Sequence, residues 1–280
     1  MKKKTLTAVI SMITILFVFS SMSYAATSDE WESAHNKYRR MHIGTPDLLW
    51  NADLAKKAQT CVDKGQTGYA EHCTNNMYHG SGSIQHVVDL WYSEKEAYKQ
   101  ETDNYAYPPN DANYKKWGHF TRVVWKSVTK VGCACKNAYC GCNYDGGNMA
   151  GQYTQNVMPE KPQVDIKVNG LDNATVSPNT PVSLAFSLDT HGWTPYSDWW
   201  FIIATPWGYY SFELGTGWVP GFSPLIRYWL FDISPPFQFF KGLLPLPKGT
   251  YLLLMGVDDP DGILNWGVNL CYDYAWLTIK

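Results

Sequence analysis

Apolar side chains recur at helical spacing through the first half of the chain. A first amphipathic helix is predicted after the polar residues 27–30, where apolar and aromatic positions lie three or four apart: Trp31, Ala34, His35, Tyr38 and Met41. A second helix is predicted around 52–62, before two glycines break the pattern. A third is predicted over 85–99, where one face carries Val87, Leu90, Trp91, Glu94 and Tyr98.

The stretch GHFTRVVWKS, residues 118–127, has a different pattern. Its β-branched and aromatic residues predict a strand over 119–125. In strand alternation His119 lies on the same side as Thr121 and Val123. Because a glycine and a histidine stand at the start of this strand, His119 either contributes chemistry or only caps a buried element.

Four cysteines stand close together in CACKNAYCGC, residues 133–142. An antiparallel hairpin with a four-residue connection places them in facing pairs on one side, Cys133 with Cys142 and Cys135 with Cys140. Disulfides are the favoured interpretation over a metal site, because oxidation removes the thiolates that a metal needs. Pairing of Cys135 or Cys140 with the region of Cys61 or Cys73 is the alternative. Six cysteines are predicted to be disulfide-bonded: Cys61, Cys73, Cys133, Cys135, Cys140 and Cys142.

Residues 159–163 are a predicted linker, and the pattern changes after them. Short apolar or aromatic runs alternate with turn residues, which predicts an all-β, aromatic-rich sandwich over 164–280. The runs are 164–168, 182–188, 198–205, 209–214, 228–233, 250–257 and 274–280. Eight of the 13 tryptophans lie beyond residue 160, where they can fill the core or, if exposed, stack on sugar rings.

The first residues are typical of a secretory signal. Three lysines precede an apolar stretch from 6 to 19, and small residues then stand at 23 and 25. Residues 1–25 are therefore predicted to be a signal peptide, and the mature chain to be secreted or extracellular, or periplasmic in a Gram-negative source. No later apolar run reaches the length of a membrane span, so none is predicted.

The charge balance argues against one class of partner. Residues 26–159 carry 14 acidic and 14 basic side chains, and residues 160–280 carry 11 acidic and 6 basic. Neither part has the basic excess of a nucleic-acid binder, so no nucleic-acid partner is expected.

Glu94 and His119 are the candidate site residues. Glu94 shares a helix face with apolar residues, and an inward carboxylate is costly unless it is hydrogen-bonded or paired. The alternative for each residue is a structural role, such as capping a backbone amide. If both point into one cleft, the pair suits metal coordination or acid–base chemistry.

Several short motifs then occur in the order of one known family. They are HN (35–36), WYSE (91–94), GHFTRVVW (118–125), GCA (132–134), CNY (142–144) and GQYTQNV (151–157). With them, residues 26–158 resemble the CAP superfamily, which includes cysteine-rich secretory proteins, antigen 5 and plant pathogenesis-related 1 proteins. The resemblance implies an α-β-α sandwich stabilised by disulfides, with the GCA and CNY cysteines bonded to each other. It also implies a cleft of two histidines and two glutamates, which binds zinc or another divalent metal in some members.

Carried over by motif, His119 and Glu94 are two of these cleft residues, and His72 is the second histidine. The family's Gly-Glu-Asn is absent, because residues 77–82 read MYHGSG. His79 is the candidate replacement for the missing glutamate ligand. A mechanism that needs two carboxylates is accordingly disfavoured.

The signal peptide and the resemblance together predict a secreted binding protein rather than an enzyme, although the resemblance alone does not choose among the activities of the family. Its expected ligands are a divalent metal such as Zn²⁺ in the cleft and a lipid, a sterol or an extracellular protein on the surface. One alternative is a cell-envelope adhesin whose C-terminal sandwich binds polysaccharide. The other is a hydrolase that uses His119 and Glu94.

Overall fold

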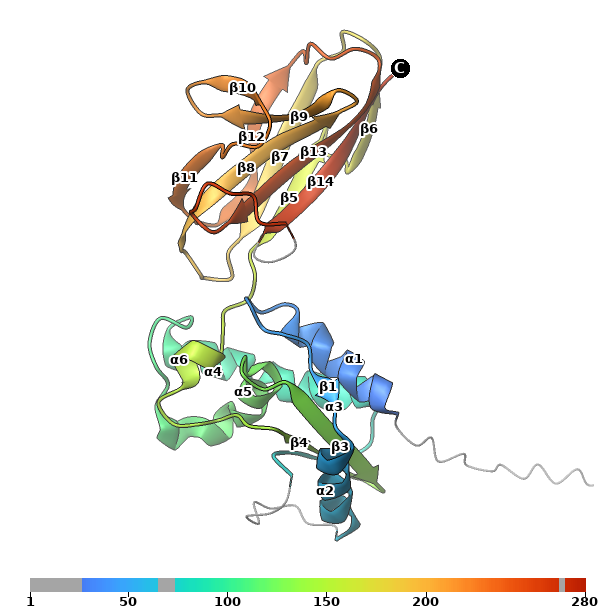
Figure 1. The fold of residues 1–280 in the computed structure, drawn as a ribbon, viewed down its shortest axis with the longest axis vertical. Helices are drawn as coiled ribbons and strands as arrows, with labels where there is room; N and C mark the ends of the chain where they lie inside the picture. Colours follow the sequence, from blue (N-terminus) through green and yellow to red (C-terminus); the bar gives the residue numbers. More distant parts are fainter. Residues whose placement is uncertain (1–26, 65–73, 267–269) are drawn as a thin grey trace, which may run out of the picture.

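The computed structural model describes residues 27–64, 74–266 and 270–280. Two bodies follow one another along the chain, the first of helices around a small sheet and the second largely β (Figure 1). The predicted signal peptide, residues 1–25, lies outside the described residues. Within the described ranges, no helix is long and apolar enough to cross a membrane.

The first body is built on a four-stranded sheet in the order β1-β3-β4-β2. The strands are β1 (Leu49–Trp50), β2 (Asn76–His79), β3 (Lys130–Lys136) and β4 (Tyr139–Tyr144). The helices are α1 (Ser28–Arg39), α2 (Ala52–Asp63), α3 (Ile84–Ser93), α4 (Lys95–Thr102), α5 (Gly118–Val124) and α6 (Tyr153–Asn156), with a 3-10 helix η1 (Asp111–Lys116). Helix α2 packs on one face of the sheet, and α1, α3 and α5 cover the other.

The cysteine-rich hairpin lies at the centre of this sheet. Strands β3 and β4 pair in the predicted register, and the facing cysteines form two disulfides, Cys133–Cys142 and Cys135–Cys140. The predicted pairing is confirmed, and the metal-site alternative is wrong for these four residues. Cys61 is also disulfide-bonded, whereas Cys73 lies outside the described residues.

Gly132 explains how closely α2 approaches the hairpin. A Cβ atom at this position would lie 2.1 Å from the backbone nitrogen of Ala55 and 2.5 Å from the carbonyl oxygen of Asn51. Only a residue without a side chain fits there, so the GCA motif has a packing reason in addition to its cysteine.

Helix α5 replaces the strand that was predicted over 119–125, and that prediction is wrong. The buried positions follow a helical spacing: Phe120, Thr121, Val123 and Val124. Tertiary contacts at both ends explain why β-branched residues adopt a helix here. Glu94 accepts hydrogen bonds from backbone N–H groups in the first turn, and Arg39 donates to carbonyls at the last.

The helix predicted over 85–99 is two helices. Helices α3 and α4 meet at Glu94, which ends the first and precedes the second. Glu94 therefore stands at a bend rather than on a continuous face.

Arg39 is fully buried at the end of α1 and binds three other segments. Its guanidinium donates to four carbonyl oxygens: Nε to Pro46 at 2.7 Å, Nη1 to Val123 at 2.9 Å and Trp125 at 3.0 Å, and Nη2 to Val128 at 2.7 Å. Burial lowers the pKa of Arg39 to about 10, which leaves the side chain charged at neutral pH. These bonds fix the C-terminal end of α5 and the loops on either side of it.

Two buried histidines belong to the same core. The Nδ1 of His35 lies 2.7 Å from the carbonyl oxygen of Trp31, and its Nε2 lies 2.9 Å from the hydroxyl of Tyr144. The Nε2 of His42 lies 3.0 Å from the hydroxyl of Tyr92. Burial lowers the pKa of both histidines to about 4, so both are neutral in the folded protein above that pH.

The second body is largely β, with two sheets. The larger has the order β10-β9-β8-β13-β14-β6 with β11 paired to β8, and the smaller has the order β12-β7-β5. The strands are β5 (Gln163–Val168), β6 (Asn173–Val176), β7 (Val182–Asp189), β8 (Tyr196–Thr205), β9 (Gly208–Glu213), β10 (Gly217–Pro220), β11 (Ile226–Trp229), β12 (Ile233–Gly242), β13 (Gly249–Asp258) and β14 (Cys271–Ile279). One hydrophobic cluster contains side chains of both sheets, among them Phe186, Trp199 and Leu253.

Most of the predicted runs lie in strands of this body, namely β5, β7, β8, β9, β13 and β14. The run 228–233 is wrong as one strand, because β11 ends at Trp229 and β12 begins at Ile233. Strand β12 was not predicted, because it contains Pro235 and Pro236 and proline is rare in strands. It lies at an edge of the smaller sheet, where the missing N–H groups of proline are tolerated.

Arg39→Lys is expected to lower the free energy of unfolding by roughly 3–5 kcal/mol, because a lysine cannot satisfy four separate carbonyl oxygens. Denaturant titration of the purified chain measures the change. Arg40→Lys is the matched control, since Arg40 is exposed and its guanidinium pairs with Asp47 on the surface. Equal losses in the two variants would contradict the role assigned to Arg39.

Acidification is expected to destabilise the fold between pH 6.5 and 4. In this window His35 and His42 are protonated in the unfolded chain but not in the folded one, so unfolding takes up protons. The free energy of unfolding therefore decreases as the pH decreases. The loss approaches roughly 3 kcal/mol for each histidine. Denaturation at a series of pH values measures it, and a double His35→Gln/His42→Gln variant with unchanged pH dependence would refute the assignment.

Candidate functional site

Glu94 and His119, the two predicted site residues, lie in contact. Glu94 stands between α3 and α4, and His119 lies in the first turn of α5. The Nδ1 of His119 is 2.7 Å from Oε1 of Glu94. The other carboxylate oxygen accepts from the backbone N–H of His119 at 2.9 Å and of Phe120 at 3.3 Å. Glu94 thus caps α5 and orients the imidazole at the same time.

Neighbouring side chains hold this pair in an accessible position. The ring of His119 stacks on Trp91 with centroids 6.2 Å apart and planes 19° apart. The indole N–H of Trp91 donates to the carbonyl oxygen of Met77 at 3.1 Å. The side chains of His119 and Glu94 are 25% and 22% exposed. A ligand can therefore reach the pair, and the imidazole of His119 and the indole of Trp91 are already fixed before the ligand arrives.

Two asparagines position the backbone at His119 and at Gly118, the residue before it. Asn76 donates to the carbonyl oxygen of His119 at 3.0 Å and to the hydroxyl of Tyr144 at 3.2 Å. Asn148 donates to the carbonyl oxygen of Gly118 at 2.8 Å. Tyr144 of the CNY motif, through Asn76, and Asn148 of the segment after it therefore hold the backbone that carries His119.

The other two predicted metal ligands are placed differently. His72 lies outside the described residues. His79 is exposed at the end of β2, and its ring stacks on Tyr139 with centroids 4.4 Å apart. Among the residues that the structure describes, His79, Glu94 and His119 do not form a group whose ligand atoms all lie within 4.8 Å of one another.

The geometry decides which atom of the pair can bind a ligand. Because Nδ1 of His119 faces Glu94, Nε2 is the ring nitrogen that remains for a metal or a proton. A carboxylate on the second nitrogen of a metal-binding histidine fixes the tautomer and raises its basicity. At this site the described residues thus offer one metal ligand, His119, with its supporting carboxylate, and they do not complete a set of ligands there.

A buried ion pair beside the site was not predicted from the sequence. Glu160, in the predicted linker, is 3% exposed and accepts from Lys95 at 2.9 and 3.0 Å and from Tyr92 at 3.0 Å. Burial alone would raise the pKa of Glu160, but hydrogen bonds from Lys95 and Tyr92 hold it below its ordinary value. Since Lys95 follows Glu94, the linker is tied to the bend that carries the site.

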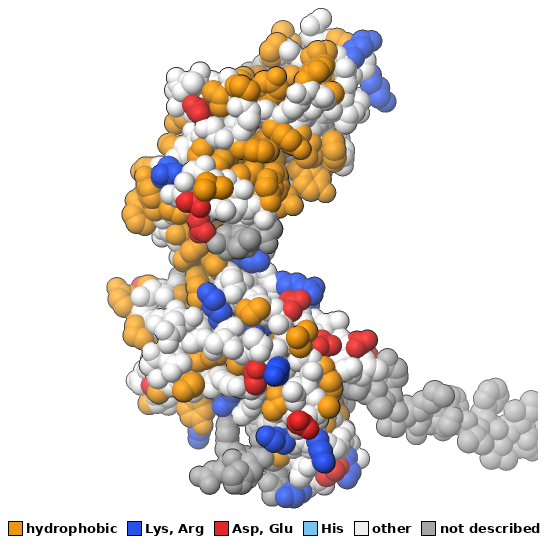
Figure 2. Space-filling view, viewed as in Figure 1, with side chains coloured by type: hydrophobic (Ala, Val, Ile, Leu, Met, Phe, Trp, Pro, Cys, Tyr) orange, Lys and Arg blue, Asp and Glu red, His pale blue; other side chains and the backbone are white. Residues whose placement is uncertain are grey.

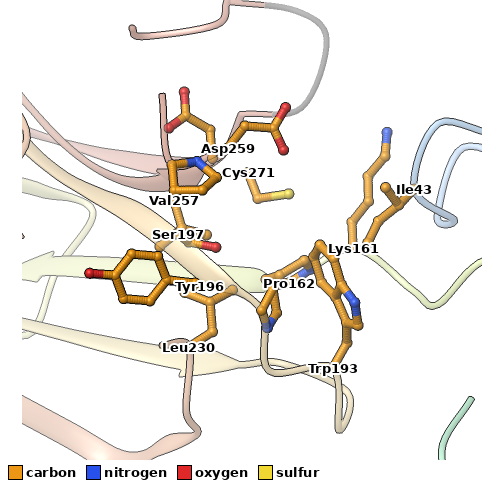
Figure 3. A pocket seen from close by; sticks show the side chains of 13 residues that line it. Ile43, Lys161, Pro162, Trp193, Tyr196, Ser197, Leu230, Val257, Asp259 and Cys271 are labelled. Atoms are coloured by element: carbon orange, nitrogen blue, oxygen red, sulfur yellow. The ribbon is translucent and has the colours of Figure 1, made fainter. Parts of the chain in front are cut away.

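A pocket of about 240 Å³ lies at the junction of the two bodies (Figure 3). Its lining is mostly apolar and comes from distant segments, including Ile43, Lys161, Trp193, Tyr196, Leu230, Val257 and Cys271. No local sequence pattern could have indicated this pocket, because it exists only where the linker meets the second body.

Comparison with known proteins gives consistent matches to one family. The model of the cysteine-rich secretory protein family, CAP, matches residues 32–153. Protein PRY2 of Saccharomyces cerevisiae is 33% identical over 135 residues, which are 45% of this chain and 39% of that protein. Secreted protein RBT4 of Candida albicans is 32% identical over 145 residues, which are 48% of this chain and 38% of that protein.

A plant relative is covered almost entirely. Pathogenesis-related protein 1B of Nicotiana tabacum is 30% identical over 164 residues, which are 51% of this chain and 90% of that protein. The chain thus spans nearly all of the tobacco protein, but only 39% and 38% of the two fungal ones. The family-model match contains Glu94, His119 and the disulfide hairpin. The chain belongs to the cysteine-rich secretory protein (CAP) family.

Proposed function

We propose that the protein is a secreted binding protein whose His119/Glu94 site holds a ligand rather than catalysing a reaction. The observation that carries this proposal is the engagement of Glu94, which accepts from three N–H groups at 2.7, 2.9 and 3.3 Å. A carboxylate used in this way orients the histidine and stabilises α5. The predicted signal peptide and a relative named as a secreted protein support secretion.

The ligand that fits the histidine is a divalent metal such as Zn²⁺. His119 would bind it through Nε2, and Glu94 would orient the ring from the second layer. His72 is the proposed second histidine, and His79 the proposed substitute for the glutamate that residues 77–82 lack. The metal would supply a Lewis-acidic centre at which a polar ligand can be held.

The surface ligand remains a separate proposal. A lipid, a sterol or an extracellular protein is the expectation that the family resemblance brings. The polysaccharide-binding alternative is favoured by the aromatic side chains exposed on the second body, among them Trp207, Trp218 and Trp266. The hydrolase alternative needs a carboxylate that can take a proton from a substrate, and the three contacts of Glu94 disfavour it.

His119→Ala is expected to abolish zinc uptake by the mature chain, and Glu94→Gln to weaken zinc binding by about 10- to 100-fold. Titration calorimetry with zinc chloride and elemental analysis measure both. His191→Asn, in the second body, is the matched histidine control and is expected to bind as wild type does. Denaturation curves run in parallel separate a lost ligand from a destabilised α5. The metal proposal fails if wild type takes up no zinc or if His119→Ala takes up as much.

Wild type and Glu94→Gln are both expected to leave a panel of peptide and ester substrates at the background rate. The reason is that Glu94 is already committed to the N-terminus of α5 and to His119. Chromatographic product analysis after prolonged incubation measures turnover. Turnover by wild type that disappears in Glu94→Gln would establish the hydrolase instead.

A further inference from the structure

Exposed apolar side chains gather on the second body, and most of them are aromatic (Figure 2). Tryptophan and tyrosine supply large rigid contact surfaces at a low cost in conformational entropy, and each has a polar group at its edge. Such side chains, when several line one concave site, are suited to a flat ligand that is partly polar.

One groove of the second body has these properties. It encloses about 270 Å³ beside the turn from β8 to β9. Three aromatic residues line it, Trp207, Tyr210 and Trp218, together with residues 244–247. These three residues remain 64%, 36% and 42% exposed, so their surfaces are open to a ligand.

The hydrophobic core fixes the orientation of Trp218. Its ring centroid lies 5.6 Å from that of Phe201 and 5.3 Å from that of Phe212. Phe201 belongs to the buried cluster that both sheets share. The indole is therefore held from behind while part of its surface stays exposed.

Hydrogen bonds fix two other parts of the groove. Thr205 accepts from the backbone N–H of Trp207 at 3.1 Å and donates to the carbonyl oxygen of Gly208 at 2.9 Å. The hydroxyl of Tyr251 donates to the carbonyl oxygen of Pro247 at 2.7 Å. The groove is thus formed before a ligand arrives, which reduces the entropic cost of binding.

Polar groups on the aromatic walls remain for a ligand. Within the described part of the chain, no side chain or carbonyl accepts a hydrogen bond from Nε1 of Trp207 or Trp218 or from the hydroxyl of Tyr210. A sugar ring offers a flat C–H face for stacking and hydroxyl groups that accept such bonds. An aliphatic lipid chain would leave these donors unused.

Charge narrows the choice of ligand further. The residues that line the groove include no Asp, Glu, Lys or Arg. Residues 163–280 carry 10 acidic and 5 basic side chains, so the body repels anionic lipid and nucleic acid. A cationic ligand would find no carboxylate in the groove itself. A neutral ligand is not repelled by the acidic body and does not need a carboxylate in the groove.

We propose that this groove binds a neutral sugar unit of a polysaccharide. Trp207 and Trp218 provide stacking faces, and Tyr210 adds a hydroxyl. The proposal deepens the binding function proposed above, but it requires nothing of Glu94 or His119. A failure of zinc binding therefore leaves it intact, and a failure of sugar binding leaves the metal proposal intact.

Titration calorimetry of the mature full chain with neutral hexasaccharides of glucose, mannose and N-acetylglucosamine tests the proposal. At least one probe is expected to bind, and Trp207→Ala is expected to weaken that binding roughly tenfold or more. Tyr210→Phe, which keeps the ring and removes the hydroxyl, is expected to weaken it less. Trp229→Ala is the matched control, because Trp229 is 57% exposed on β11 and does not line the groove.

Three results would overturn the proposal. One is no binding of any neutral hexasaccharide by folded wild type. Another is equal loss in Trp207→Ala and Trp229→Ala, which would mean that the groove is not the site. The third is stronger binding of choline, a polyproline decamer or phosphatidylcholine vesicles than of any hexasaccharide. Trp207→Phe guards against a folding artefact, since it retains a stacking ring and is expected to keep most of the affinity.

Discussion

The guanidinium of Arg39 is the interaction on which the first body depends. A charge buried this deeply is tolerated only because four carbonyl oxygens surround it. Two of these carbonyls, of Val123 and Trp125, lie at the end of α5, where a cation is favoured by the helix dipole. A helix as short as α5 is not stable by itself. It exists because Arg39 binds its last turn and Glu94 binds its first.

The same constraint creates the candidate site. Glu94 must cap α5 to stabilise it, and its remaining oxygen then lies 2.7 Å from Nδ1 of His119. The structural and the functional interpretation of Glu94 are therefore not alternatives. The cap fixes the tautomer and the direction of His119, and this fixed direction is what a metal ligand or a polar contact requires. The same carboxylate thus serves the stability of α5 and the orientation of His119.

The sequence predicted those features that depend on local geometry. The pairing of Cys133 with Cys142 follows from alternation in a hairpin, and most strands of the second body follow from short apolar runs between turns. Helix α5 was missed because its β-branched residues favour a strand, and the contacts that override this preference come from Arg39 and Glu94, far away in the chain. The contact between Glu94 and His119 was expected from the family motifs, whereas residue spacing alone did not decide whether the two side chains meet.

The buried Glu160 has a consequence for how the two bodies act together. Backbone hydrogen bonds from Ile43 to Pro159 and from Lys161 to Met41 bind the linker on both sides of Glu160. Strand β5 begins at Gln163, so Pro162 is the only residue between the bound segment and the second body. A connection this short cannot act as a flexible tether. If the groove beside β9 holds a polysaccharide, this short connection keeps α5 close to a fixed distance from it. The groove would then determine where the proposed ligand site at His119 lies relative to the polysaccharide (Figure 1).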